Sequence, residues 1–187
     1  YPTTHKFHHL DGIRRRVETP YKLTEYNPYI EAFWKWWPSL YKDLHTFRIT
    51  GGEPLLSKDT FRVLEYIQDH WEKNPNLSLA INTNLGVPDS LIDRLIEIVK
   101  DLTENNKVRE LIIFTSVEAT EKQAEYLRYG IDYGKFFNNV EKVLKELPKV
   151  TVNIMAAFNA LSVFSYGDLI DKVYELKKKY HNEHRYW

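Results

Sequence analysis

Cysteine is absent from the 187 residues of this chain. Without a thiol, the chain alone cannot form a disulfide scaffold, a thiolate nucleophile, or a thiolate-based zinc or iron–sulfur site. The sequence also lacks a run of about 18 apolar residues, which a membrane span requires, and a signal-peptide pattern at its start. These absences favour a soluble, cytoplasmic protein.

An excess of charge of either sign is missing as well, because 26 basic residues balance 26 acidic ones. Proteins that bind nucleic acid usually carry a basic excess, which displaces the counterions of the phosphates. The balance therefore argues against a nucleic-acid partner and equally against an anionic membrane surface. Apolar material is plentiful, since 43% of the residues are hydrophobic and 14% are aromatic. That is enough to bury the core of about one domain.

Strands and helices are predicted to alternate after an aperiodic opening. Residues 1–26 are polar and aromatic without periodicity, which predicts a long loop. Apolar residues at three- and four-residue spacing then predict a helix from Asn27, which Pro38 should kink or divide. Strands are predicted at residues 45–50, 77–83, 109–117 and 150–158, each followed by a helix. This α/β pattern is typical of a parallel sheet, either open and doubly wound or part of a barrel.

The turns that follow the four strands are the candidate ligand site. In both architectures, ligand groups gather where parallel strands end. In the first turn, GGEP, two glycines let the backbone approach a ligand, Pro54 stiffens the exit and Glu53 adds a negative charge. Carbonyls with a carboxylate suit an ammonium group, which offers only donors. The alternative is a plain turn with a solvated Glu53. The later turns are NTNLG, SVEA and AAFNALS.

These turns resemble those of the radical S-adenosylmethionine superfamily. The segment RITGGEPLLS is similar to the superfamily's amino-group-binding segment, in which GGEP ends the second strand of a partial (β/α)6 barrel. Asn82-Thr83-Asn84 resembles its third-strand turn, although Leu85 interrupts the motif, and Ser116-Val117-Glu118 resembles its fourth-strand segment. The likeness runs from about Pro28 to Trp187. The aromatic helix before GGEP and residues 116–139 are similar to radical enzymes with a twitch domain, in which a C-terminal extension follows the barrel, and we expect no such extension within these residues.

The resemblance implies a fold, a cofactor and a reaction. The fold is the parallel-sheet portion of a TIM-like barrel, with about four β/α units in a domain at residues 27–187 that lacks the first and last strands. The complete protein would cleave S-adenosylmethionine reductively to a 5′-deoxyadenosyl radical, with an electron donor, and modify a peptide or protein. No residue of this chain is expected to be catalytic or to bind metal. The implied cofactor contacts are Gly51, Gly52, Glu53 and Pro54 at the ammonium, Thr83 and Asn84 in the next turn, Ser116 at the ribose, Arg128 at the carboxylate, and Asn153 on the adenine side.

The chain departs from the superfamily in one essential feature. A [4Fe–4S] cluster is held there by a CxxxCxxC loop after the first strand, and oxygen or imidazole ligands do not replace three thiolates around such a cluster. The chain as given cannot cleave the cofactor, so we expect the cluster loop to lie upstream of it. The alternative is a degenerate, non-catalytic S-adenosylmethionine-binding or scaffold module. A third possibility, a phosphate-binding turn, is disfavoured by Glu53.

Several further residues carry weaker signals. Arg48 precedes GGEP and is interpreted as the partner of Glu53 or of a neighbouring carboxylate, without an assigned role. Trp34 and Trp37 fall on the apolar stripe and are predicted to pack in the core, whereas Trp36 projects elsewhere and is a candidate for an interface. Histidines spaced three apart can bind metal, but no acidic partner has matching spacing, so they are predicted to be solvated: His5, His8, His9, His181 and His184.

Overall fold

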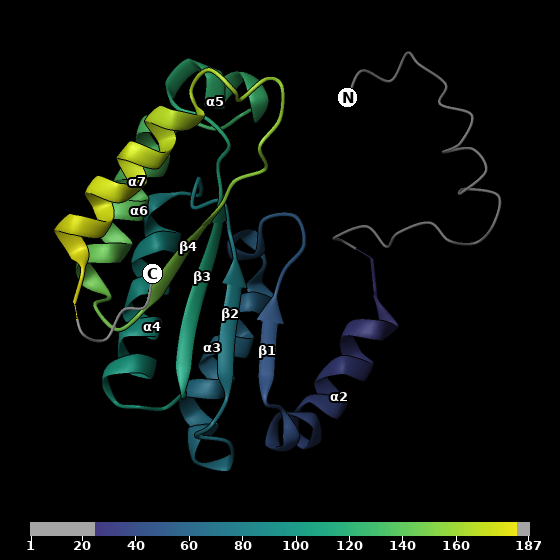
Figure 1. Ribbon diagram of the computed structural model, residues 1–187. Coiled ribbons are helices and arrows are strands. Elements are labelled where there is room, and N and C mark those ends of the chain that lie inside the picture. Colours follow the sequence, from purple (N-terminus) through teal and green to yellow (C-terminus); the bar gives the residue numbers. More distant parts are fainter. Residues whose placement is uncertain (1–24, 183–187) are drawn as a thin grey trace. The chain divides into compact units, whose positions relative to one another are not determined.

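A computed structural model describes residues 25–182 of the chain, and Figure 1 shows the arrangement of its helices and strands. Nearly all of the predicted opening loop therefore lies outside the described residues, as do His5, His8, His9 and His184. The chain divides into two compact units, residues 1–40 and residues 41–187. No helix in the described part is long and apolar enough to span a membrane.

Helix α2 (Pro28–Asp43) begins in the first unit. Asn27 caps it, because the Asn27 side-chain oxygen accepts a hydrogen bond from the backbone N–H of Tyr29 at 3.0 Å. The helix continues through Pro38 and is not divided there. Trp37 is fully buried and Trp36 is 59% exposed, as their positions on and off the apolar stripe predict.

The second unit is built on one parallel sheet of β1 (Thr46–Ile49), β2 (Ser78–Asn82), β3 (Glu110–Ser116) and β4 (Thr151–Met155). The spatial order is β1-β2-β3-β4, and every neighbouring pair is parallel. The four predicted strands and the predicted α/β class are confirmed. Sequential order is what an arc of a TIM-like barrel would have, while closure into a barrel stays a prediction.

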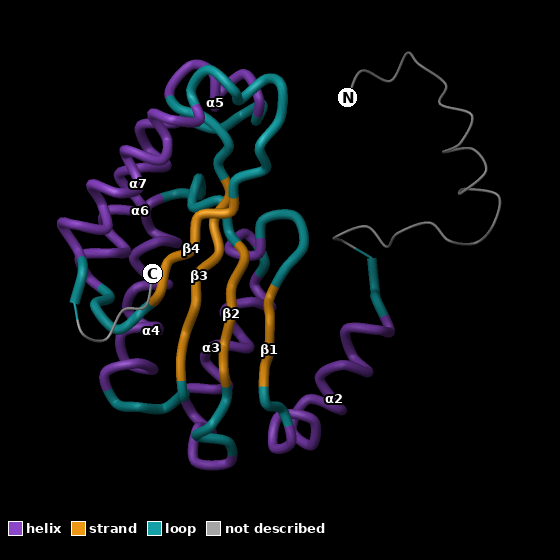
Figure 2. The backbone as a smooth tube through the Cα atoms, viewed as in Figure 1, coloured by secondary structure: helices purple, strands orange, loops and turns teal. Residues whose placement is uncertain are grey.

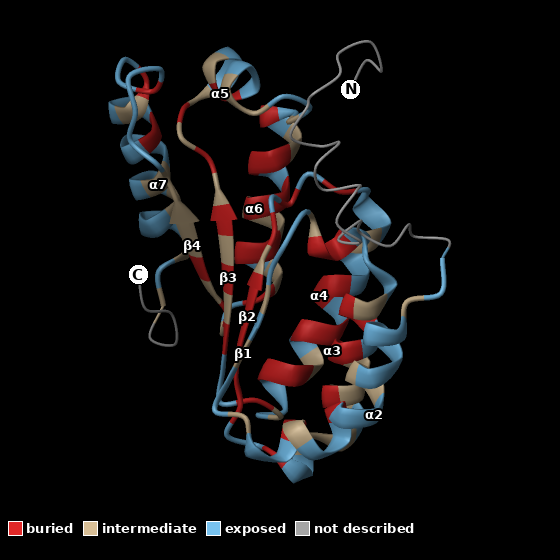
Figure 3. Ribbon diagram, turned by 90° about the vertical axis from the view of Figure 1, so that its right-hand side faces the viewer, coloured by how far each residue is buried: buried red, intermediate tan, exposed pale blue. Residues whose placement is uncertain are grey.

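Helices connect the strands and also follow β4, and together they form one continuous layer. The long ones are α3 (Lys58–His70), α4 (Asp89–Glu104), α6 (Tyr133–Glu146) and α7 (Tyr166–Tyr180). Each packs against the next, α3 on α4, α4 on α6 and α6 on α7. Right-handed crossovers between sequential parallel strands place their helices on the same face of the sheet. Figure 3 shows α3 and α4 together on one side of the strands.

Short helical segments fill the connections that Figure 2 draws between the main elements. They are the 3-10 turns η1 (Pro54–Leu56) and η2 (Trp71–Lys73), and the α-helix α5 (Glu121–Leu127). The spacing of apolar residues does not predict α5, because this helix has no apolar stripe. In the structure it buries only Ala124.

The two faces of the sheet differ in character. Leu79, Ile81, Leu111 and Ile113 are at most 1% exposed and form the core under the helix layer. Alternate residues of the strands point to the opposite face. We call this opposite face the open face, and by strand register it carries Arg48, Ala80 and Ile112 in one row, then Asn82, Phe114 and Asn153 in the next, and Ser116 with Met155 beyond them.

Candidate ligand-binding site

A cleft of about 290 Å³ lies at the carboxyl ends of the strands, where the open face meets the strand-to-helix turns. This is the edge at which parallel α/β sheets bind their ligands. Residues from three consecutive turns converge on it, together with side chains of the open face. Its lining consists of Thr50, Gly51, Gly52, Asn82, Thr83, Asn84, Phe114, Ser116, Arg128 and Met155.

The first turn presents bare backbone to the cleft. Gly51 has a φ of +106°, a backbone conformation that residues other than glycine rarely adopt. Gly51 and Gly52 are both exposed, and a Cβ atom at either position would meet no other atom within 4 Å. A ligand can therefore approach the peptide groups of this turn closely.

Glu53 links the first turn to the second. Its Oε1 accepts hydrogen bonds from the Leu55 backbone N–H at 3.1 Å and from the Thr83 hydroxyl at 2.7 Å. Its Oε2 accepts one from the Asn84 backbone N–H at 2.8 Å. A carboxylate offers about four acceptor positions, so about one remains for another donor. Glu53 is half-buried and does not line the cleft, and its contact with an ammonium group stays a prediction.

The second turn explains why Leu85 interrupts the expected motif. Leu85 has a positive φ of 53° and is fully buried. Its carbonyl accepts a hydrogen bond of 2.7 Å from the side chain of Asn139, which is itself buried on α6. The Thr83 hydroxyl accepts from the Leu85 N–H at 3.0 Å, and the Asn84 side chain accepts from the Gly86 N–H at 2.8 Å. Leu85 thus anchors the turn in the core and leaves Asn84 exposed at the cleft.

The third turn contributes Ser116 and a paired cation. Ser116 ends β3, and Arg128 follows α5 directly. The Arg128 guanidinium donates to both carboxylate oxygens of Glu118, from Nε at 2.6 Å and also from Nη2. Arg128 lines the cleft, so a ligand carboxylate there would share the guanidinium with Glu118.

The structure brings together six of the nine predicted contacts, namely Gly51, Gly52, Thr83, Asn84, Ser116 and Arg128. The other three lie outside the lining of the cleft: Glu53 is half-buried, Pro54 is buried, and Asn153 is on β4 beside Phe114. Thr50, Phe114 and Met155 also line the cleft but carry no signal in the sequence interpretation, and Asn82 lines it too, although only the other two residues of its turn motif were implied contacts. The period-two alternation of the strands is the signal that could have placed Asn82 and Phe114 there.

Arg48 has a different partner from the one expected. Its Nε donates to the Asn82 side-chain oxygen at 2.7 Å, and its guanidinium lies 4.2 Å from the centroid of the Phe114 ring. Neither Glu53 nor another carboxylate of the described residues pairs with it. An amide contact and a cation–π contact therefore take the place of the expected ion pair. Asn82 and Phe114, which make these contacts, stand in the row of the open face that follows the row of Arg48.

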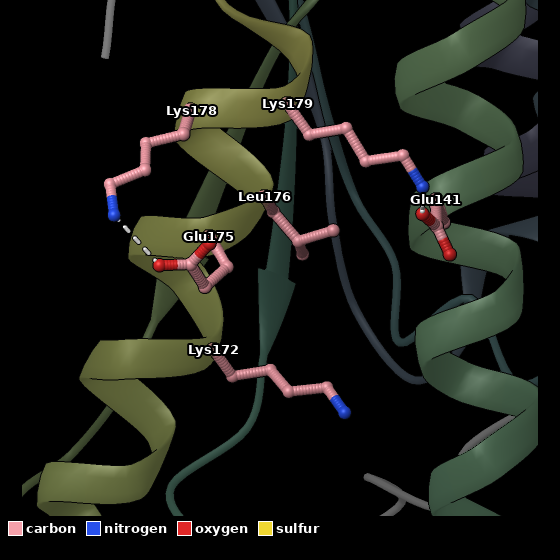
Figure 4. Close-up of a pocket in the computed structure, with 6 residues that line it drawn as sticks. All are labelled: Glu141, Lys172, Glu175, Leu176, Lys178 and Lys179. Atoms are coloured by element: carbon pink, nitrogen blue, oxygen red, sulfur yellow. Dashed lines mark hydrogen bonds and ion pairs between the residues drawn. The ribbon is translucent and has the colours of Figure 1, made fainter.

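A second hollow, of about 400 Å³, lies between α6 and α7 and is larger than the cleft (Figure 4). Four of its charged side chains form ion pairs with one another, Lys179 with Glu141 and, at 2.8 Å, Lys178 with Glu175. The side chains that line it are long and come from two helix surfaces, not from strand ends. We interpret it as a solvated groove between helices. The cleft at the strand ends remains the candidate site.

Residues 25–182 contain no group of three or more histidine, cysteine, aspartate or glutamate side chains arranged to hold a metal ion. His181, at the end of α7, is exposed as predicted. Comparisons of the chain with protein-family models, with curated proteins and with solved structures found no match. The family resemblance therefore depends on the motifs and on their positions in the fold.

Proposed function

We propose that this chain binds S-adenosylmethionine in the cleft and is the central part of a radical S-adenosylmethionine enzyme. One observation carries the proposal: three consecutive turns, each resembling a cofactor-binding segment of that superfamily, meet in a single cleft. Gly51 and Gly52 come from the first turn, Thr83 and Asn84 from the second, and Ser116 with Arg128 from the third.

The chemistry of the cleft suits the amino-acid end of this cofactor. An ammonium group has donors only, and the exposed glycine turn offers carbonyl acceptors, with the negatively charged Glu53 next in the sequence. Arg128 would hold the ligand carboxylate, and the Ser116 hydroxyl would contact the ribose. Ligand pockets usually measure about 300 to 1,000 Å³, so a cleft of about 290 Å³ would hold only part of this cofactor. The adenine would then extend onto the open face, toward Asn153.

The residues of this chain do not fit a [4Fe–4S] cluster, because such clusters are held by thiolates and the chain has no cysteine. We therefore derive no step of reductive cleavage from this chain. In the proposal, the cluster, its electron donor and a peptide or protein substrate belong to the complete enzyme. The part played here is to bind and orient the cofactor.

One observation favours a second candidate, a non-catalytic module that keeps the scaffold. The charged groups near the cleft already have partners within the chain, Glu53 in the second turn and Arg128 with Glu118. A scaffold that no longer binds a cofactor would be stabilised by such internal pairs. This candidate predicts either weak binding of S-adenosylmethionine or none.

Isothermal titration calorimetry with S-adenosylmethionine tests the proposal. We expect saturable binding at one site per chain, weakened about 2- to 10-fold by Ser116→Ala and at least about tenfold by Arg128→Gln, because hydrogen bonds to charged groups are the stronger ones. Arg94→Gln, on the exposed surface of α4, is the matched control and should bind as the original chain does.

Two outcomes would count against the proposal. Heat changes that never saturate would favour the scaffold candidate, and unchanged affinity in Arg128→Gln would remove Arg128 from the site. Cofactor binding alone does not separate an enzyme from a binding module. The upstream coding sequence does so, since the enzymatic proposal requires clustered cysteines within about forty residues in frame.

A further inference from the structure

Arg48 is a cation on the open face that the proposed cofactor site does not use. We propose that Arg48, Asn82 and Phe114 form a subsite for a carboxylate group of the substrate, next to the cleft. The inference rests on the proposed function only in treating the ligand of the cleft as a cofactor and the carboxylate as part of the substrate.

The guanidinium of Arg48 is held in a defined place. Arg48 stands on β1 in register with Ala80, yet its head group reaches the following row of the open face. The small side chain of Ala80 leaves room for the arginine stem to lean along the strand direction, as strand side chains commonly do. Asn82 then fixes the Nε edge at 2.7 Å, and the Phe114 ring supports one face of the guanidinium at 4.2 Å.

These two contacts leave the Nη1 and Nη2 end of the guanidinium available. Nε is occupied by Asn82, while Nη1 and Nη2 together carry four N–H donors. Within residues 25–182 these groups have no carboxylate partner. Arg94 provides a comparison within the chain. Its guanidinium also lies over an aromatic ring, 4.4 Å from the centroid of Phe61, but it pairs with the carboxylate of Glu65. Arg48 has the same aromatic support without the internal anion.

The charge of the surroundings matches a carboxylate better than a phosphate. Arg109 pairs with Glu110 at 2.9 Å near the start of β3, and Arg128 pairs with Glu118 at the cleft, so these charges cancel. Among residues 25–182, Arg48 therefore provides one positive charge without an internal anion, while Glu53 in the adjacent turn keeps a negative charge that only neutral donors contact. A carboxylate carries one negative charge and two oxygens that fit paired N–H groups, whereas a phosphate monoester carries nearly two charges.

The subsite adjoins the cleft, because Asn82 and Phe114 contribute to both. A ligand in the cleft and a carboxylate on Arg48 would have these two side chains as common neighbours. Arg48 would thus orient a substrate whose reacting atom faces the cofactor. The substrate class that the open face favours is a molecule or peptide that carries a carboxylate.

A nuclear magnetic resonance titration of the isotope-labelled chain tests the inference, with N-acetylglycine as the carboxylate probe and N-acetylglycinamide as its neutral analogue. We expect N-acetylglycine to shift the Arg48 Nε–H signal and the backbone amide signals of Asn82 and Phe114, both without and with saturating S-adenosylmethionine. The affinity should fall at least about tenfold in Arg48→Gln and stay unchanged in Arg94→Gln. Arg48→Lys, which keeps the charge but loses the planar fork, should lie between.

Each other outcome is decisive. Equal affinity in Arg48→Gln, with its circular dichroism spectrum unchanged, would overturn the inference, and so would equal binding of the neutral analogue. Tighter binding of inorganic phosphate at the same signals would overturn the carboxylate class. Displacement of N-acetylglycine by S-adenosylmethionine would assign Arg48 to the cofactor's own carboxylate instead. N-acetylglycine binding by a chain that shows no calorimetric binding of S-adenosylmethionine would overturn the proposed function and leave the anion subsite standing.

Discussion

Among single residues, Gly51 is the position in the cleft where the backbone itself restricts the side chain. Its φ of +106° is strained for any residue with a Cβ atom, whereas Gly52 does not have a positive φ. We expect Gly51→Ala to lower the free energy of unfolding by about 1 to 2 kcal/mol. Gly52→Ala is the matched control and should change it by less than about 0.5 kcal/mol. Urea denaturation measures both, and equal losses would contradict the assignment of strain to Gly51.

Glu53 tests whether a residue expected to meet a ligand has a structural role instead. Glu53→Ala removes the acceptor of three hydrogen bonds, including the one from the buried Thr83 hydroxyl. We expect the free energy of unfolding to fall by about 1 to 3 kcal/mol without ligand. Glu97→Ala, on the exposed side of α4, should change it by less than about 0.5 kcal/mol. If Glu53→Ala is as stable as the original chain, the carboxylate does not join the two turns.

Between elements, Asp101 ties the end of α4 to α3 and to the loop before β3. Its carboxylate accepts hydrogen bonds from Gln68, Asn105 and Lys107. Burial raises the pKa of Asp101, but these hydrogen bonds outweigh burial and leave the pKa below its ordinary value. The ionised group therefore stabilises the fold above about pH 4, the pKa range of the unfolded chain, and this contribution is lost as the pH falls through the lower folded pKa.

We accordingly expect Asp101→Asn to lower the free energy of unfolding by about 1 to 2 kcal/mol at pH 7. The difference from the original chain should shrink as the pH falls below about 4. Asp93→Asn, which removes an exposed ion pair with Lys142, should cost at most about 1 kcal/mol and serves as the control. Urea denaturation of both variants at pH values from about 3 to about 7 measures the free energy of unfolding across the range in which carboxyl groups titrate. A difference that grows on acidification would have the wrong sign for a lowered pKa.

The elements themselves could be read from the sequence, because apolar periodicity and Gly, Pro and Asn signals mark strands and helices locally. Gly51 and Gly52 could also be placed at the site from the sequence, because they directly follow a predicted strand. The partners of Arg48 and Glu53 could not, since they depend on which residues of neighbouring strands and turns come into register. Helix α5 lacked the apolar stripe that makes a helix visible in a sequence.

For the second unit as a whole, sheet order has a consequence for stability. The described strands place β2 and β3 in the centre and β1 and β4 at the two edges. An edge strand has N–H and C=O groups that its own sheet does not pair. The resemblance predicts further strands at these edges in a complete barrel, so the edges are where the barrel proposal can be tested on the chain itself.

Hydrogen exchange followed by nuclear magnetic resonance provides that test. We expect amides of β2 and β3, such as those of Ile81 and Ile113, to exchange only through opening close to global unfolding. Amides of β1 and β4 that point away from β2 and β3 should exchange at least about tenfold faster, because no described strand protects them. Outward amides of β1 that exchange as slowly as Ile81 would show that a segment outside residues 25–182 pairs with this edge. That result would contradict the edge assignment of β1 and favour a sheet that extends toward a barrel.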